Sequence, residues 1–264
     1  MNILFSVIAV FFLIACERKE NFINLEEKNG VIYNKLSKIP FTGKVSGLSK
    51  GNIKKGLKEG KWKKYYENGK IKEKGQYNNN IKEGKWFFYY NNGNLESKKN
   101  FKEGKLNGEL ITYYKNKKVS QKENYILDKR EGKFLKYNAS EKLQKKGFYK
   151  AGKREGQYLE FYSTGQLMYE EFYIDDKLNK FRKVYYKNGN LQSKTSYKEG
   201  NKEGKSFFYY KDGNLLKKSS YFNDKLEGQL FYYYVDGQYK KKEYYKNNKL
   251  HGERILYHKN QGLL

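Results

Sequence analysis

Glycine recurs at a fixed interval of 24 residues through most of the chain. The series starts at Gly60, and Lys180 stands in the one slot that breaks it. The other members are Gly84, Gly108, Gly132, Gly156, Gly204, Gly228 and Gly252. A fixed period of roughly 20 to 50 residues is typical of repeat architectures, in which each unit buries its apolar surface only against its neighbours. The period therefore predicts an array of stacked units instead of one globular core.

Three apolar columns keep the same spacing without an insertion. The first is aromatic: Tyr65, Tyr89, Tyr113, Tyr137, Phe161, Tyr185, Tyr209, Tyr233 and Tyr257. The second is also aromatic: Tyr77, Phe101, Tyr125, Tyr149, Tyr173, Tyr197, Tyr221 and Tyr245. The third is mainly aliphatic: Ile71, Leu95, Val119, Leu143, Leu167, Leu191, Leu215 and Tyr239. With 28 Tyr, 17 Phe and one Pro, the composition favours strands and turns and argues against disorder.

Each unit has the pattern of a β-hairpin. In the first, residues 60–67 and 70–77 are the expected strands, and Asn68-Gly69 is the expected two-residue turn of type I′, which needs a positive φ at both positions. This register places Gly60 opposite Tyr77, Trp62 opposite Gly75, and Tyr66 opposite Ile71. The turn pair recurs as Asn92-Gly93, Thr164-Gly165, Asn188-Gly189, Asp212-Gly213 and Asp236-Gly237.

Some parts of the chain depart from this pattern. Asn116-Lys117 and Ser140-Glu141 lack the turn glycine, so we expect distorted or longer turns there. Residues 78–83 are expected to form the loop between hairpins, and the last unit to end after one strand at 252–259. The predicted fold class is all-β, an elongated array of stacked antiparallel β-hairpins with a 24-residue repeat. We expect the array at 41–264 and a linker and N-terminal cap at 17–40, with the linker over 17–30.

The chain begins with an apolar run, ILFSVIAVFFLIA, that ends directly before Cys16. Thirteen residues rise about 20 Å as a helix, which is too short to cross a membrane but suits a secretory signal. The residues Leu13-Ile14-Ala15-Cys16 resemble a bacterial lipobox, in which the cysteine is lipidated. Residues 1–16 are therefore predicted to be a lipoprotein signal peptide, with Cys16 anchoring the protein in a membrane at the periplasmic or extracellular face of the cell envelope.

The sequence offers no constellation for catalysis, and we predict that the protein is not an enzyme and needs no cofactor or metal. The two histidines, His251 and His258, lie in the last unit, and Cys16 is the single cysteine. Glutamate recurs before the repeat glycine, which indicates a structural position at a turn and not a catalytic pair. These residues are Glu59, Glu83, Glu131, Glu155, Glu203 and Glu227.

Lysine dominates the net charge of +27 and forms a column of its own. Its members are Lys74, Lys98, Lys122, Lys146, Lys194, Lys218 and Lys242, with Glu170 in the remaining slot. The predicted register puts this column on the face of the Tyr65 column, with neighbours two strands, or about 9.6 Å, apart. Such a row attracts an anionic membrane or an acidic glycan. A solvated face that suppresses aggregation explains it equally well. Single-stranded nucleic acid also suits lysines among aromatics, but an envelope location disfavours it.

The segments Glu59-Gly60-Lys61-Trp62 and Tyr65-Tyr66-Glu67-Asn68-Gly69 resemble the MORN-repeat-variant family of bacterial proteins. The resemblance extends from Phe41 to the C-terminus. It implies a hairpin array that binds lipids or proteins and has no catalytic residues. Many members of the family belong to the YwqK-type antitoxin-like group. We therefore expect a membrane-tethered binding or scaffolding module for an anionic or protein partner, and the alternative is an antitoxin that neutralises a toxin by binding it.

Overall fold

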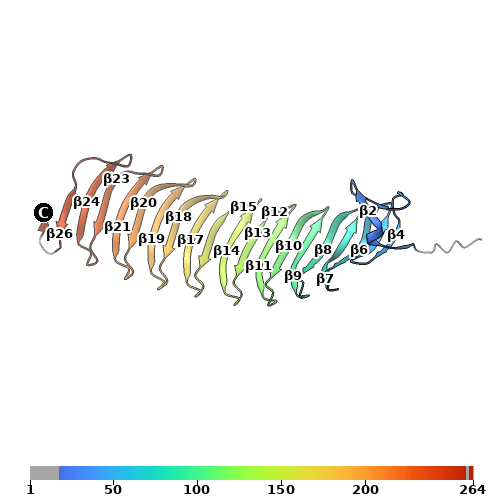
Figure 1. Cartoon of the computed structure of the whole chain (residues 1–264). Helices are drawn as coiled ribbons and strands as arrows, with labels where there is room; N and C mark the ends of the chain where they lie inside the picture. Colours follow the sequence, from blue (N-terminus) through green and yellow to red (C-terminus); the bar gives the residue numbers. More distant parts are fainter. Residues whose placement is uncertain (1–17, 260–261, 264) are drawn as a thin grey trace, which may run out of the picture.

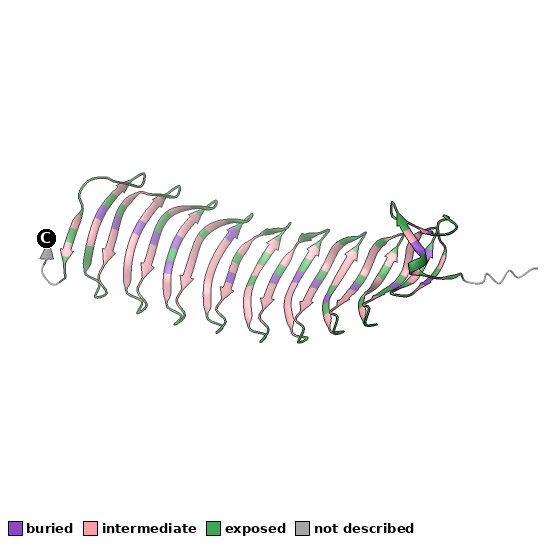
Figure 2. Cartoon of the chain, in the orientation of Figure 1, coloured by how far each residue is buried: buried purple, intermediate pink, exposed green. Residues whose placement is uncertain are grey.

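The computed structural model describes residues 18–259 and 262–263, and shows a nearly all-β chain. Mostly antiparallel strands follow one another along a single long, gradually twisting sheet, with a small cap at its N-terminal end (Figure 1). The predicted all-β array is confirmed. Because the sheet has no second layer along most of its length, burial is confined to patches near the middle of the strands, while the loops at both edges are exposed (Figure 2).

The cap covers the first strands of the sheet. β1 pairs in parallel with β4, and β2 and β3 form a separate hairpin. Its elements are β1 (Lys19–Asn21), the 3-10 helix η1 (Phe22–Asn24), β2 (Leu25–Lys28), β3 (Val31–Asn34), β4 (Gly43–Ser46) and β5 (Ser49–Lys54). Leu25, Ile32, Phe41, Val45, Ile53 and Trp62 form its buried core. Residues 19–28, which we expected to be linker, are therefore folded into the cap.

The repeat units follow the cap without a break. Their strands are β6 (Leu57–Tyr65), β7 (Ile71–Asn78), β8 (Ile81–Tyr89), β9 (Leu95–Lys102), β10 (Lys105–Tyr113), β11 (Val119–Ile126), β12 (Lys129–Arg130), β13 (Gly132–Tyr137), β14 (Leu143–Lys150), β15 (Lys153–Arg154), β16 (Gly156–Phe161), β17 (Leu167–Ile174), β18 (Lys177–Tyr185), β19 (Leu191–Lys198), β20 (Asn201–Tyr209), β21 (Leu215–Phe222), β22 (Lys225–Leu226), β23 (Gly228–Tyr233), β24 (Tyr239–Lys246), β25 (Lys249–Leu250), β26 (Ile255–His258) and β27 (Gly262–Leu263). β27 pairs with β26, so the last unit does not end after one strand as predicted.

The loop that closes each predicted hairpin has three residues and not two. In the first unit only Gly69 of the expected turn pair has a positive φ, +78°. The Gly69 N–H donates to the Tyr66 carbonyl at 2.9 Å, and the Tyr66 N–H donates to the Lys70 carbonyl at 2.8 Å. This is a type I turn followed by a left-handed residue that forms a β-bulge. The predicted type I′ turn is wrong at this edge, and Tyr65, not Tyr66, lies opposite Ile71.

The two units without a turn glycine adopt the same loop. Lys117 and Glu141 occupy the left-handed position with φ of +70° and +63°. The hydrogen bonds recur, with the Lys117 N–H donating to Tyr114 and the Glu141 N–H donating to Asn138, both at 2.9 Å. The expectation of longer or distorted turns is therefore wrong. Both residues instead adopt the left-handed backbone conformation, which costs a residue with a side chain about 1 kcal/mol.

Type I′ turns do occur, but at the opposite edge of the sheet. Asn79 and Asn80 have φ of +48° and +67°, and β8 starts at the next residue. Residues 78–83 are therefore a two-residue turn flanked by strand, and the predicted loop is wrong. Equivalent pairs with positive φ at both positions are Glu103-Gly104, Leu127-Asp128, Ala151-Gly152, Asp175-Asp176, Glu199-Gly200, Asn223-Asp224 and Asn247-Asn248.

The recurring glutamate before the repeat glycine stabilises this turn. The Glu59 carboxylate accepts a hydrogen bond from the Asn79 N–H at 3.0 Å, and the Asn80 side chain accepts one from the Lys58 N–H at 2.6 Å. The same acceptor role is taken by Glu83, Glu131, Glu155, Glu203 and Glu227. These carboxylates are thus turn residues of the repeat, as the sequence indicated.

The repeat glycine produces a bulge that shifts the register between hairpins. Gly84 has a φ of +64°, and the pairing of β7 with β8 shifts there, so that Lys74 faces Phe87 while Gln76 faces Glu83. Lys180, which breaks the glycine series, adopts the same conformation with a φ of +60°. Glycine takes up this backbone at no steric cost, whereas a lysine does so under strain.

In most units the bulge seats a large hydrophobic side chain on a neighbouring strand, whereas Arg182 and Ser206 stand at this position in two units. Trp86 is 1% exposed, and a Cβ placed on Gly75 would lie 2.2 Å from its ring. The Tyr77 ring lies at 4.9 Å, edge to face, and the Lys82 ammonium lies 4.1 Å from the indole centroid. We call this side of the sheet the packed face. It carries Trp62, Trp86, Leu110, Phe134, Tyr158 and Leu230.

Tyrosine hydroxyls join consecutive units at the edge of the three-residue loops. The Tyr66 hydroxyl donates to the Tyr89 carbonyl of the next unit at 2.7 Å. The bond recurs from Tyr90, Tyr114, Tyr162, Tyr186, Tyr210 and Tyr234. Because each bond crosses a unit boundary, it ties one hairpin to the next along this edge, except where Asn138 replaces the tyrosine.

Candidate functional site

The lysine column lies on the face opposite the packed face, in an unbroken cross-strand row. Lys74 faces Lys63 on one side and Phe87 on the other, and Lys98 lies between Phe87 and Ile111. The row then continues through Lys122, Leu135, Lys146, Leu159, Glu170, Lys183, Lys194, Phe207, Lys218, Phe231, Lys242 and Ile255. We call this the lysine row. All seven lysines that the sequence singled out belong to it.

Three of the seven lysines place their ammonium groups near aromatic rings. The Lys74 ammonium lies 5.3 Å from the centroid of Phe87 and 5.5 Å from that of Tyr89. The Lys98 ammonium lies 5.8 Å from the Tyr113 ring, and Lys242 lies 3.9 Å from Tyr239. In the part of the chain that the structure describes, none of the seven lysines forms an ion pair. A cation over a ring keeps its charge available to an external anion.

Glu170 is the acidic residue in the row, and Lys183 faces it on β18. Their side chains form an ion pair of 2.9 Å, and the Tyr185 hydroxyl donates to the same carboxylate at 3.0 Å. Burial opposes ionisation, but the hydrogen bonds from Lys183, Gln157 and Tyr185 hold the pKa of Glu170 below its ordinary value. The carboxylate therefore stays charged and neutralises the row at this one place.

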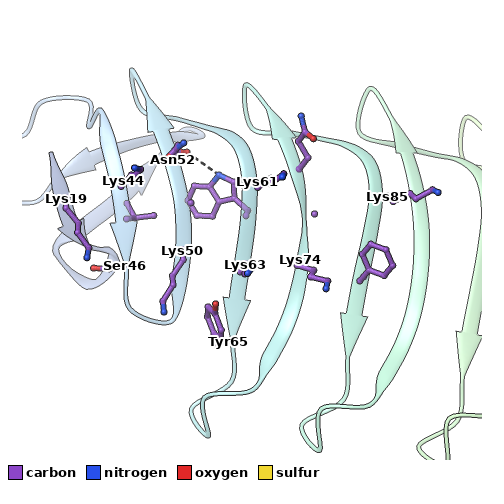
Figure 3. Close-up of a pocket in the computed structure, with 16 residues that line it drawn as sticks. Lys19, Lys44, Ser46, Lys50, Asn52, Lys61, Lys63, Tyr65, Lys74 and Lys85 are labelled. Carbon is purple, nitrogen blue, oxygen red and sulfur yellow. Dashed lines mark hydrogen bonds between the residues drawn. The ribbon is translucent and has the colours of Figure 1, made fainter. Parts of the chain in front are cut away.

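A hollow of about 670 Å³ opens at the N-terminal end of the lysine row. Seven lysines line it, together with Tyr65 and Phe87, and none of the described residues that line it is Asp or Glu. These lysines are Lys19, Lys44, Lys50, Lys61, Lys63, Lys74 and Lys85. They come from β1 and β4–β8, and Lys50, Lys63 and Lys74 follow one another across adjacent strands (Figure 3).

Among these lysines, only Lys74 belongs to the column that the sequence pattern predicts. A signal was present, because the column to which Lys63 belongs is apolar in most units, as Phe87, Ile111 and Leu135 show. Lys63 can be recognised as part of a lysine cluster only when the strand register places it between Lys50 and Lys74. Residues outside the repeat, such as Lys19 and Lys44, had no column to mark them.

The other predicted features fall outside this face. Cys16 and the signal peptide precede the first described residue. Among residues 18–259 and 262–263, no helix is long and apolar enough to cross a membrane. Within the same residues, no cluster of three or more His, Cys, Asp or Glu side chains is arranged to hold a metal ion.

Comparisons with known proteins recognise the repeat. The family model described as "MORN repeat variant" matches seven segments, 58–79, 82–103, 106–126, 130–151, 154–175, 182–199 and 202–223. A search of curated proteins gives no match. Among solved structures, one titled "Crystal Structure of TcdB2-TccC3-Cdc42" aligns with 89% of this chain and 17% of that chain, at 12% identity and a TM-score of 0.17. The chain thus spans about a sixth of the length of that protein.

Proposed function

The chain belongs to the family of MORN repeat variants, and we propose that it is a non-catalytic binding array, tethered to the bacterial cell envelope through Cys16, whose lysine row holds an extended anionic partner. MORN repeats are generally involved in protein or membrane binding. The finer proposal rests on one observation: seven lysines without ion pairs in the described structure lie in register along one face of the sheet.

The arrangement suits an extended partner better than a small ligand. Lysines on alternate strands lie about 9.6 Å apart, close to the Debye length of roughly 8–10 Å at moderate salt, so neighbouring charges add their fields. Lysine is a mobile point charge without the planar fork of arginine, so the row attracts negative charge without demanding one geometry. A membrane leaflet or an acidic polymer offers charges in this way.

The tether follows from the N-terminal sequence. The lipobox-like Leu13-Ile14-Ala15-Cys16 closes an apolar run of signal-peptide length. Stable anchoring requires more than one acyl chain, as such lipoproteins carry. Metabolic labelling with a fatty acid is therefore expected to mark the wild-type protein and not Cys16→Ala. Wild-type protein that stays unlabelled and cytosolic would rule out the tether without touching the role of the row.

In the described structure the ammonium groups of four lysines of the row do not lie over an aromatic ring, so replacing these lysines mainly changes charge. Lys122, Lys146, Lys194 and Lys218 are replaced together by Gln, and binding to phosphatidylglycerol vesicles is measured by co-sedimentation over a range of salt concentrations. At about 1 kcal/mol for each lysine near an anionic surface, affinity is expected to fall by two to three orders of magnitude. Wild-type binding is expected to weaken steeply with salt.

A matched control carries the same charge change at the edge of the sheet. Lys115, Lys187 and Lys211 are exposed residues of the three-residue loops, Lys142 is exposed directly after such a loop, and all four are replaced by Gln. This control variant is expected to retain most of the binding to phosphatidylglycerol vesicles. The wild-type protein is expected to bind phosphatidylcholine vesicles much more weakly than phosphatidylglycerol vesicles. Equal losses in the two quadruple variants would show that only net charge matters, and the row would then be a solvated face.

A further inference from the structure

We propose that the hollow at the N-terminal end of the lysine row is a separate binding site for a saccharide that carries two phosphate groups. The inference rests on the proposed role of this face in holding anions, but it concerns Lys50 and Lys63, which the row's own lysine column does not include. The hollow of about 670 Å³ is within the range of roughly 300–1,000 Å³ that small-molecule sites occupy.

The central observation is three lysines in consecutive register. Lys50 faces Lys63, and Lys63 faces Lys74, on strands about 4.8 Å apart. Like charges directly opposite each other destabilise a sheet. In the described part of the chain none of these three lysines forms an ion pair, and the lining of the hollow contains no carboxylate. A bound ligand with several negative charges would relieve this repulsion.

Beside the turns, Lys102 faces Lys105 and Lys246 faces Lys249, but two lysine pairs in the middle of the strands have a carboxylate next to them. Lys183 faces Lys194 further along the row, and there Glu170 is next in register and pairs with Lys183 at 2.9 Å. On the packed face, Lys136 faces Lys145, and Glu160 lies next in register and pairs with Lys145 at 3.0 Å. The three central lysines of the hollow, Lys50, Lys63 and Lys74, depart from this arrangement, because among the described residues no carboxylate pairs with them.

The remaining lining groups select a phosphorylated sugar. Lysine is a common phosphate ligand, and two phosphomonoesters carry between about −3 and −4 charges near neutral pH, which matches three central ammonium groups. Asn52 and Gln76 present uncharged amides that hydrogen-bond to hydroxyls, and Tyr65 and Phe87 present apolar surface. The Lys50 ammonium lies 4.9 Å from the Tyr65 ring, which positions this charge at one side of the hollow.

The hollow lies near the proposed anchor. Lys19 lines it and is three residues from Cys16, a stretch of chain that reaches at most about 11 Å. In the tethered protein the hollow therefore stays close to the membrane surface. The sugar bisphosphate can come from a lipid headgroup or from solution, and both present the same groups to the lysines.

The test uses the full chain with glucose 1,6-bisphosphate as the probe, glucose 1-phosphate and inorganic phosphate as comparison ligands, and isothermal titration calorimetry as the readout. The bisphosphate is expected to bind at least tenfold more tightly than either comparison ligand. Lys50→Gln combined with Lys63→Gln is expected to weaken it by about ten- to a hundredfold. The quadruple variant at Lys122, Lys146, Lys194 and Lys218 is expected to bind the bisphosphate as wild type does.

A stability measurement separates a binding role from a structural one. Because Lys63 stands between two like charges, Lys63→Gln is expected to unfold at the same temperature as the wild type or a higher one. The bisphosphate is expected to raise the unfolding temperature of the wild type and not that of the double variant. A lower unfolding temperature for unliganded Lys63→Gln, unchanged affinity in the double variant, or inorganic phosphate binding as tightly as the bisphosphate would each overturn the proposal.

Vesicles that carry a diphosphorylated glycolipid identify the source of the ligand. Recruitment that the soluble bisphosphate displaces, and that the double variant loses, supports the site and assigns it to a headgroup. Bisphosphate binding without recruitment supports the site and assigns it to a free sugar. Failure of the lysine row in phosphatidylglycerol binding leaves these results intact, so the two proposals fail separately.

Discussion

Replacing Gly75 by alanine tests whether the packed face depends on a close approach of ring to backbone. Gly75 is not among the residues with positive φ, so alanine fits its backbone, and the added methyl group is the whole perturbation. That methyl group would lie 2.2 Å from the ring of Trp86, which is 1% exposed and has nowhere to move without disturbing Tyr77. Overpacking of this kind costs about 1–3 kcal/mol.

Amide hydrogen exchange is the suitable assay because units of an array open locally. Gly75→Ala is expected to speed exchange in β7 and β8 by about fivefold to a hundredfold and leave β20 and β21 unchanged. Ser219→Ala is the matched control at the equivalent position. The Ser219 hydroxyl is buried and has no hydrogen-bond partner among the described residues, so its removal is expected to be neutral or stabilising.

A second substitution refines the test. Leu110 is the equivalent of Trp86 in the next unit, and it lies opposite Lys99, the equivalent of Gly75. A leucine at this position is therefore compatible with a Cβ on the facing residue. Trp86→Leu is therefore expected to cost less in the Gly75→Ala background than in the wild type. Wild-type exchange in Gly75→Ala, or additive effects in the double variant, would refute the argument from close packing.

Three further predictions concern strain and pH. Lys180→Gly removes a lysine with a left-handed backbone and is expected to stabilise its unit by about 1 kcal/mol. In the wild type, the amides of residues 180–186 should exchange faster than those of residues 204–210, and the opposite order would contradict this prediction. Burial opposes ionisation of Glu243, but ion pairs with Lys241 and Arg254 hold its pKa below 4.5. Because the pKa of Glu243 is lower in the folded than in the unfolded protein, this stabilisation is present above pH 4.5 and is lost as the pH falls through the folded value. As the pH is lowered, the unfolding temperature should therefore decline less steeply in Glu243→Gln than in the wild type. Burial raises the pKa of Tyr77 and Tyr158 from 10.0 to about 12, so stability should be intact below pH 10 and fall between pH 10 and 12, and an unfolding temperature that stays constant over this range would contradict the prediction.

The fold class followed from local information in the sequence. A period of 24 residues with aromatic and aliphatic columns at fixed offsets is compatible with one kind of unit, a pair of strands. The pairings of Gly60 with Tyr77 and of Trp62 with Gly75 were also predicted correctly. Within a hairpin the chain distance between partners is short, so the position of the turn largely determines the register.

The turn types were assigned to the wrong edges for a physical reason. Asn-Gly is compatible with a type I′ turn and equally with a type I turn whose last position is left-handed, and the pair alone does not distinguish them. At the other edge, Asn79-Asn80 holds the type I′ conformation because the Glu59 carboxylate and the Lys58 N–H bind the turn across the sheet. Those partners are about twenty residues away, outside the range of a turn motif.

The candidate sites divide in the same way between sequence and structure. Repetition alone gathered Lys74 and its equivalents into one column, because residues one period apart must occupy equivalent places in identical units. The positions of Lys50 and Lys63 beside Lys74, and of Trp86 over Gly75, depend on how consecutive hairpins align. That alignment is set by the bulge at the repeat glycine, where a positive φ inserts extra residues into one strand. A period determines which residues are equivalent, whereas only the hydrogen-bonded sheet determines which residues are neighbours.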